Sequence, residues 1–367
     1  VLDPASGSGH FLVAAAHRIA RRLAAVRTGD SEPSPEAVRH ALRDVVSRCI
    51  YAVDVNEMAV ELCKVSLWLE ALDPGRPLSF LDAHVKRGNS LLGVTPALFA
   101  RGIPDAAYKE AHALDDKEAC RALGKRNRTE RKSLEEGKRQ VTLEETATAR
   151  ARELAEAARR LAETGDDSPE AVAAKEAAFR KLVESGAYRR AKLAADAWCA
   201  AFFLPKRKGS DGITTDTVRR LLDSPDSVPE ALRQEVDRVA SELGFFHWHL
   251  EFPEVFWVGE GVPENPEAGW SGGFDVVLGN PPWERVKLEE KQFFAVRAPE
   301  VAAARTKAER HRAIERLKAQ DPHLYRAYQE ALHRADAELG FIHGSGRYPL
   351  CGRGDTNTYA VFAETFR

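Results

Sequence analysis

Cysteine is scarce in this sequence of 367 residues, and the few cysteines lack the spacing of a metal site or a disulfide framework. They are Cys49, Cys63, Cys120, Cys199 and Cys351, without a Cys-x-x-Cys pair. Their odd number and scatter argue against a zinc site or disulfides and favour a reducing, cytoplasmic setting. No apolar run approaches the roughly 18 residues that cross a membrane, so no membrane partner is expected, and we find no secretory signal.

The chain also lacks a substantial net charge, since 54 Lys and Arg stand against 56 Asp and Glu. The total charge therefore does not indicate a nucleic-acid-binding protein, and any basic surface must be local. Apolar residues make up 44% of the chain, which is sufficient for a buried core. The only methionine is Met58 and not the first residue, so we interpret the chain as a segment of a longer protein.

Three segments differ in character: residues 1–95, 96–245 and 246–367. The first alternates short apolar runs with helical patterns, which is typical of an α/β fold with a doubly wound parallel sheet. The second is rich in Ala, Glu, Lys and Arg and predicts a helical insertion. Within it, residues 121–132 carry six basic residues against one acidic. A solvated helix face explains this run, with phosphate contact as the alternative.

Apolar patterns and turn residues predict the individual elements. Strands are expected at residues 1–2, 49–53, 84–85, 245–252 and 274–279, and helices at 10–25, 36–48, 57–72, within 284–339 and from 356 onward. Breaks in the insertion are expected at 165–169 and 208–212. Asn56 is the expected N-cap of the helix at 57–72.

A glycine loop, Asp3-Pro4-Ala5-Ser6-Gly7-Ser8-Gly9, joins the first strand to the first helix. Such a loop points backbone N–H groups at a ligand, and its glycines carry no Cβ atom that would block close approach. Leu12 stands where a dinucleotide-binding fingerprint has its third glycine. The absence of Gly-Lys-Ser/Thr excludes a triphosphate loop. A tight turn without a ligand is the alternative.

Asp54 ends the second expected strand. In nucleoside-binding α/β folds an acidic residue at this place accepts hydrogen bonds from both ribose hydroxyls. It lies about 45 residues after the glycines rather than about 20, because a longer helical segment intervenes. The alternative is a helix-capping role, which Asn56 already suits.

The tetrapeptide Asn280-Pro281-Pro282-Trp283 follows the strand 274–279, which is expected to be buried, and so lies at the edge of the sheet where ligands bind in such folds. Asn280 offers a side-chain carbonyl, Pro281 offers a backbone carbonyl without a donor, and Trp283 offers a flat apolar face. Two acceptors beside an aromatic face suit a planar base that bears an exocyclic amine. A Pro-Pro turn with a core tryptophan is the alternative.

Both motifs resemble those of a known family. Residues 3–12 are similar to the first motif, and residues 274–283 to the fourth, catalytic motif, of S-adenosylmethionine-dependent DNA adenine-N6 methyltransferases. The order, cofactor motif before catalytic motif, is that of the gamma class. Residues 250–256 and 280–294 resemble the large bacterial methylases of restriction–modification and phage-defence systems.

The resemblance implies a Rossmann-like class I methyltransferase sheet, incomplete in this chain, with a large helical insertion. It implies a bacterial, cytoplasmic protein that acts on double-stranded DNA with one adenine flipped out of the helix, without a metal. S-adenosylmethionine is expected at Asp3, Pro4, Ala5, Ser6, Gly7, Gly9, Phe11, Asp54, Val55 and Asn89. Catalysis is expected from Asn280, Pro281, Pro282 and Trp283.

Two positions depart from the family pattern. Ser6 stands where cysteine is frequent, a change between small residues that we expect to be harmless. Asn89 stands where many relatives have an aspartate that accepts from the adenine amine of the cofactor. Asn89 can still accept through its carbonyl oxygen, and Asp82 is the weaker candidate for this contact.

Two other functions stay open at this point. The tetrapeptide also resembles that of glutamine and guanine methyltransferases, so RNA or a protein glutamine is an alternative substrate, and a non-catalytic DNA-binding module is another alternative. The family fold further implies strands before Val1 and after Arg367, and a target-recognition region of the same parent protein. On that expectation the chain alone binds the cofactor weakly and does not methylate a defined DNA site.

Overall fold

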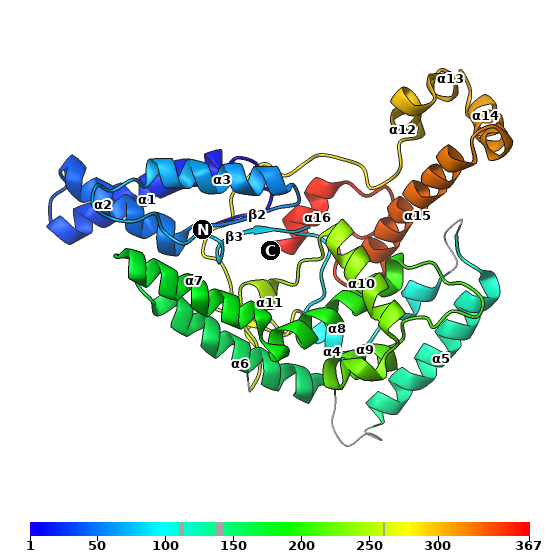
Figure 1. Ribbon diagram of the computed structural model, residues 1–367, viewed down its shortest axis with the longest axis horizontal. Helices are drawn as coiled ribbons and strands as arrows, with labels where there is room; N and C mark the ends of the chain where they lie inside the picture. Colours follow the sequence, from blue (N-terminus) through cyan, green and yellow to red (C-terminus); the bar gives the residue numbers. More distant parts are fainter. Residues whose placement is uncertain (110–113, 137–142, 260) are drawn as a thin grey trace.

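The computed structural model describes residues 1–109, 114–136, 143–259 and 261–367 (Figure 1). The chain has a mixed α/β fold that is mostly helical, with one three-stranded sheet and one two-stranded sheet among these residues. No helix in this part of the chain is long and apolar enough to cross a membrane.

The larger sheet is parallel and has the order β1-β2-β3, with strands Leu2–Asp3, Tyr51–Asp54 and Val85–Arg87. The strands expected at the start of the chain, at 49–53 and near 84–85 are therefore confirmed. Because the strands are parallel, their carboxyl ends share one edge of the sheet.

A fourth stretch, residues 274–278, lies on the free side of β1. Leu2 donates its N–H to the Val276 carbonyl at 2.9 Å, and Leu278 donates to the Leu2 carbonyl at 2.9 Å. The expected strand at 274–279 is thus reduced to one parallel bridge, between Leu2 and Val277. The expectation of a buried strand was wrong: Val276 is 46% and Val277 37% exposed. No strand among the described residues pairs with the outer edge of this stretch.

Three helices accompany the sheet: α1 (His10–Thr28), α2 (Pro35–Cys49) and α3 (Glu57–Glu70). Their small and branched apolar residues pack together with Leu81 and Val85 in one cluster. All three were predicted, with ends shifted by up to three residues. The predicted N-cap is also confirmed, because the Asn56 side chain accepts the Met58 N–H at 3.0 Å.

The insertion is helical as predicted, with breaks near the expected glycines. Its α-helices are α4 (Pro96–Ala100), α5 (Lys117–Glu135), α6 (Leu143–Glu163), α7 (Pro169–Glu184), α8 (Gly186–Phe203), α9 (Thr215–Asp223) and α10 (Glu230–Leu243). On α5, Arg126 pairs with Glu130, while Arg128 and Arg131 pair with Asp105. These pairs favour the solvated helix face over phosphate contact for residues 121–132.

The aromatic run at 245–252 was expected to form a strand, and this expectation was wrong. It makes a single bridge between Phe245 and Asn89 and then turns into the short helix α11 (Trp248–Glu251). A short apolar run that is buried on all sides has the same pattern in a strand and in a helix. The small second sheet follows, with antiparallel strands β4 (Phe256–Trp257) and β5 (Ser271–Gly272).

The last part of the chain is helical, as predicted. It contains α12 (Glu290–Arg297), α13 (Pro299–Ala302), α14 (Lys307–Gln320), α15 (Pro322–Gly344) and α16 (Thr358–Thr365). In Figure 1, α12, α13 and α14 project from the body at the far end of α15, while α16 lies beside the sheet.

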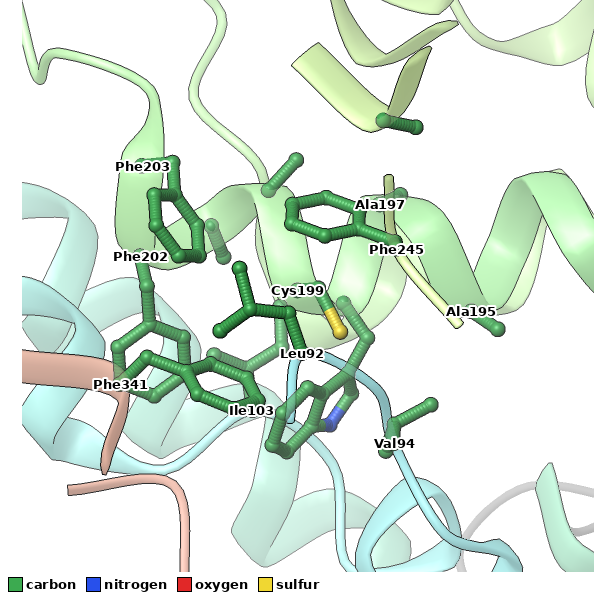
Figure 2. Close-up of a cluster of buried hydrophobic side chains, with 14 of the residues drawn as sticks. Leu92, Val94, Ile103, Ala195, Ala197, Cys199, Phe202, Phe203, Phe245 and Phe341 are labelled. Carbon is green, nitrogen blue, oxygen red and sulfur yellow. The ribbon is translucent and has the colours of Figure 1, made fainter. Parts of the chain in front are cut away.

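One hydrophobic cluster joins the three segments of the chain. Figure 2 shows Leu92 and Val94, which follow β3, packed with Cys199 of α8 and Phe341 of α15. Trp198 is fully buried in the same cluster. The insertion therefore shares a core with both other segments. The boundaries at 95/96 and 245/246 remain predictions.

Candidate cofactor and substrate site

Four loops meet at the carboxyl edge of the parallel sheet. They follow β1, β2, β3 and the stretch 274–278, and they contain most of the residues singled out in the sequence. Ligands of open parallel α/β sheets bind at this edge.

The glycine loop after β1 wraps around the end of β2. Ser6 donates its N–H to the Val53 carbonyl at 3.1 Å. Gly7 and Gly9 have φ values of 53° and 86°, in the left-handed region that favours glycine. A Cβ at Gly9 would lie 2.7 Å from the Cys63 sulfur of α3, whereas no atom lies within 4 Å of one at Gly7. Gly9 thus permits close packing on α3, and Gly7 faces open space.

Asp54 ties the end of β2 to this loop. Its Oδ2 accepts the Gly7 N–H at 2.9 Å, and its Oδ1 accepts the Asn56 N–H at 2.8 Å. Since Asn56 itself caps α3, Asp54 does not. A carboxylate has about four lone-pair positions, so two stay available for the hydroxyls of a ribose.

The loop after β3 contains Asn89, whose Oδ1 accepts the Leu91 N–H at 3.0 Å. The next residue, Ser90, donates its hydroxyl to the Pro4 carbonyl at 2.6 Å and so ties this loop to the glycine loop. Asp82 lies before β3, on the amino side of the strand, and pairs with Lys64 at 2.8 Å. Of the two candidates for the adenine contact, only Asn89 lies at the carboxyl edge.

Asp3 lies between the glycine loop and the catalytic tetrapeptide. A Cβ at Gly279 would lie 2.5 Å from its Oδ1, so only glycine allows the tetrapeptide to approach this closely. Asp3 is 1% exposed, and its Oδ2 has no hydrogen-bond partner among the described residues. Burial raises the pKa of the Asp3 carboxyl to about 6, opposed by the Ala5 N–H and reinforced by the charge of Asp54. A buried, unpartnered carboxylate oxygen fits a cationic ligand.

This raised pKa predicts a pH-dependent stability. Below its ordinary pKa of 3.8 the Asp3 carboxyl is protonated in both the folded and the unfolded protein. Between pH 3.8 and about 6 the unfolded protein releases this proton while the folded protein keeps it, so the free energy of unfolding falls as the pH rises through this window. A shift of about two units corresponds to about 3 kcal/mol. Between pH 4 and pH 8 we expect the free energy of unfolding to fall by about 2–3 kcal/mol more in the wild type than in the Asp3→Asn variant. Urea unfolding at several pH values measures it, and identical pH profiles of the variant and the wild type would contradict it.

The tetrapeptide Asn280-Pro281-Pro282-Trp283 presents its Asn280 and Trp283 side chains to solvent. The Asn280 side chain is exposed and makes no hydrogen bond to any described residue. Trp283 is 74% exposed, which excludes the alternative of a core tryptophan. Its ring centroid lies 5.5 Å from that of Tyr359, with the planes inclined by 44°.

The N-terminus of α16 holds the tetrapeptide in place. Thr358 donates its hydroxyl to the Pro282 carbonyl and accepts the Glu284 N–H at 3.0 Å. Sequence reasoning identified a helix start here but missed the contacts of Thr358 and Tyr359 with the tetrapeptide. No local signal links positions 358 and 282, because the contact depends on tertiary packing.

The remaining predicted residues divide into buried and exposed groups. Pro4 and Ser6 are buried within the glycine loop, and Ala5 is half-buried. Phe11, in the first turn of α1, and Val55, directly after β2, are exposed apolar side chains near the sheet edge. No group of residues suited to a metal ion occurs in the described part of the chain.

A glycine loop and an Asn-Pro-Pro-Trp loop thus lie on one edge of the parallel sheet. A sequence profile of the Eco57I restriction-modification methylase family matches residues 48–342, and the chain belongs to this family. The match begins after the glycine loop, so the assignment of that loop rests on its geometry.

One curated relative is a protein of Methanocaldococcus jannaschii, provisionally named as a type II restriction enzyme and methyltransferase. It is 33% identical over 105 residues, which is 25% of this chain and 8% of that protein. The chain thus aligns with a small part of this relative. No solved structure matches the chain.

Proposed function

We propose that the chain is the catalytic part of a DNA methyltransferase that transfers a methyl group from S-adenosylmethionine to the N6 amine of a flipped adenine. The biological role is DNA modification in restriction–modification or phage defence. The stretch 274–278, β1, β2 and β3 form the Rossmann-like part of the fold on this proposal. The observation that carries the proposal is the free Asn280 carbonyl beside the exposed Trp283, with Asp3 directly behind them.

The residues present fit S-adenosylmethionine. Its ammonium and sulfonium charges suit the buried Asp3 carboxylate, and Asp54 has lone pairs for the ribose. Gly7 leaves space beside the loop, and Asn89 offers an acceptor to the adenine amine. When bound, the cofactor supplies an electrophilic methyl group.

The amine of adenine is a poor nucleophile because its lone pair is delocalised into the ring. The base must leave the duplex, at a cost of a few kcal/mol, and would stack on Trp283. The Asn280 side chain and the Pro281 carbonyl each accept one N6 hydrogen. These contacts localise the lone pair and stabilise the positive charge that develops on nitrogen.

Transfer of a labelled methyl group tests the substrate class. The natural protein that contains this chain is incubated with labelled S-adenosylmethionine and with DNA, RNA or a protein extract. We expect label in DNA alone. Label in RNA or protein would assign the alternative methyltransferase function, and no transfer to any of the three would support a non-catalytic module.

A further inference from the structure

A helical arm, residues 288–332, forms a separate folded unit beyond the catalytic tetrapeptide. It comprises α12, α13, α14 and the first half of α15, which project from the body in Figure 1. It has its own hydrophobic cluster, whose buried members are Phe294, Ala298, Val301, Ala313, Ile314, Leu317 and Tyr328. The arm is therefore a folded helical unit with a hydrophobic core of its own.

Polar contacts fix the helices of the arm to one another. Glu290 of α12 accepts from Arg310 of α14 at 2.7 Å and from the Tyr328 hydroxyl of α15 at 3.0 Å. Thr306 and Glu309 form a capping box at the start of α14. These contacts and the cluster hold the arm together, so exposed side chains on its surface can be replaced without unfolding it.

The arm is basic, although the whole chain is not. The arm as a whole, residues 288–332, contains nine Lys and Arg against seven Asp and Glu, a formal charge of +2, whereas the whole chain has −2. Three of the acidic residues lie at the two ends of the arm, so its middle, residues 291–326, carries nine basic against four acidic residues, a formal charge of +5. Two of the nine are paired, Arg310 with Glu290 and Lys318 with Glu315. The other seven have no carboxylate partner among the described residues: Lys291, Arg297, Arg305, Lys307, Arg312, Arg316 and Arg326. All seven are exposed.

The unpaired cations point away from the arm's core. On α14, Arg312 and Arg316 are one turn apart on the solvent side, and the helix buries Ala313, Ile314 and Leu317. This differs from α5, where basic residues of similar density are paired with Glu130 and Asp105. A row of exposed cations without internal partners is suited to an external polyanion.

A cleft connects the arm to the catalytic tetrapeptide. It has a volume of about 980 Å³, begins at Trp283 and is lined by α12 and α15, with four basic residues, Arg285, Lys287, Arg297 and Arg334, and four acidic residues, Glu284, Glu289, Glu330 and Glu338. Three of these cations pair with carboxylates, and Arg297 is the one without such a partner among the described residues. Trp283 shares this cleft with residues 327–338 of α15, and the first half of that helix belongs to the arm. The arm therefore lies within reach of the backbone of a duplex whose base occupies the site.

We infer that the basic arm binds the phosphate backbone of double-stranded DNA within about one turn of the duplex from the flipped base. This inference rests on the proposed function, because it assumes that the flipped base binds at Trp283. Duplex DNA carries one negative charge per about 1.7 Å of its axis, which matches a surface of spaced Arg and Lys. Contacts of this kind position the enzyme and do not read sequence.

The double variant Arg312→Gln/Arg316→Gln tests the inference in the natural protein. The control is Arg180→Gln/Arg238→Gln, which removes the same charge from exposed arginines paired with Glu176 and Glu235. Fluorescence anisotropy gives the Kd for a labelled 30-base-pair duplex, an arbitrary length, over a series of salt concentrations. Each lost phosphate contact lowers the slope of log K against log salt by about 0.9. We expect a slope lower by about two and a Kd on the order of 10- to 60-fold higher at 0.1 M salt.

The control should keep the wild-type Kd and slope, and both variants should keep the wild-type affinity for S-adenosylmethionine. Arm variants with an unchanged Kd and slope, in a protein that methylates DNA, would overturn the inference and leave the proposed function standing. A weakening of equal size in the control would also overturn it. A wild-type protein that transfers no methyl group to DNA, but whose DNA binding is weakened only in the arm variant, would overturn the proposed function and support the interface.

Discussion

Replacement of Asn280 by Ala is expected to slow methyl transfer about 10²–10³-fold, the usual effect of losing one preorganised polar contact to the reacting group. The variant removes one of the two acceptors of the N6 hydrogens, and the Pro281 carbonyl remains. Because the Asn280 side chain is exposed and bonds to no described residue, its removal leaves no buried partner unsatisfied. We therefore expect a normal fold and nearly unchanged cofactor affinity.

Single-turnover kinetics of the natural protein with labelled cofactor measure this effect. The matched control is Gln234→Ala, which removes an exposed amide on α10, away from the four loops. The control should react at the wild-type rate. Transfer by the Asn280 variant at near-wild-type speed would refute the catalytic assignment of the tetrapeptide.

The second large effect is expected at Asp54. Replacement by Ala should weaken the binding of S-adenosylmethionine, or of its demethylated product, by about 2–3 kcal/mol, the scale of lost charge-assisted hydrogen bonds. The structure adds a second reason for this loss. Gly7 and Asn56 both donate to this carboxylate, so the glycine loop also loses its anchor on β2.

Calorimetry decides this prediction, with Asp82→Ala as the control. Asp82 is an acidic residue before β3 that pairs with Lys64, on the far side of the strand from the site. Its replacement should leave cofactor affinity unchanged. An unchanged affinity of the Asp54 variant would assign Asp54 a structural role alone.

Local signals in the sequence were sufficient for the elements that hold the cofactor loop. The strand β2 continues a short apolar run, β3 begins at Val85, within the predicted position 84–85, and Asn56 begins α3 with a side-chain cap, so each could be predicted from adjacent residues. The positive φ values at Gly7 and Gly9 also follow from the residue type and the tight turn.

Contacts between distant segments could not be predicted in this way. Trp248 begins a helix within the aromatic run because the surrounding core buries the run on all sides. Val277 is exposed because only β1 flanks its stretch among the described residues. The approach of Gly279 to Asp3, and of Thr358 to Pro282, joins positions more than 70 residues apart. Such contacts depend on the assembled fold and leave no periodicity in the chain.

The basic arm is another feature whose role could not be predicted from the sequence alone. Its charges are visible in the sequence, but a charged helical run is normally a solvated face. Only the structure separates α5, whose Arg126, Arg128 and Arg131 are paired with Glu130 or Asp105, from α14, whose Arg312 and Arg316 have no carboxylate partner among the described residues. The proposed role of the arm therefore rests on the absence of carboxylate partners for these arginines among the described residues, and not on the composition of the arm.

The identity of the methylated nucleoside tests the central claim most directly. DNA is incubated with the natural protein and S-adenosylmethionine, digested to nucleosides and analysed by mass spectrometry, with the Asn280→Ala variant in parallel. Our account predicts N6-methyl-2′-deoxyadenosine as the product of the wild type, and much less of it from the Asn280→Ala variant. Methylated cytosine as the only product, or equal yields from the variant and the wild type, would contradict it.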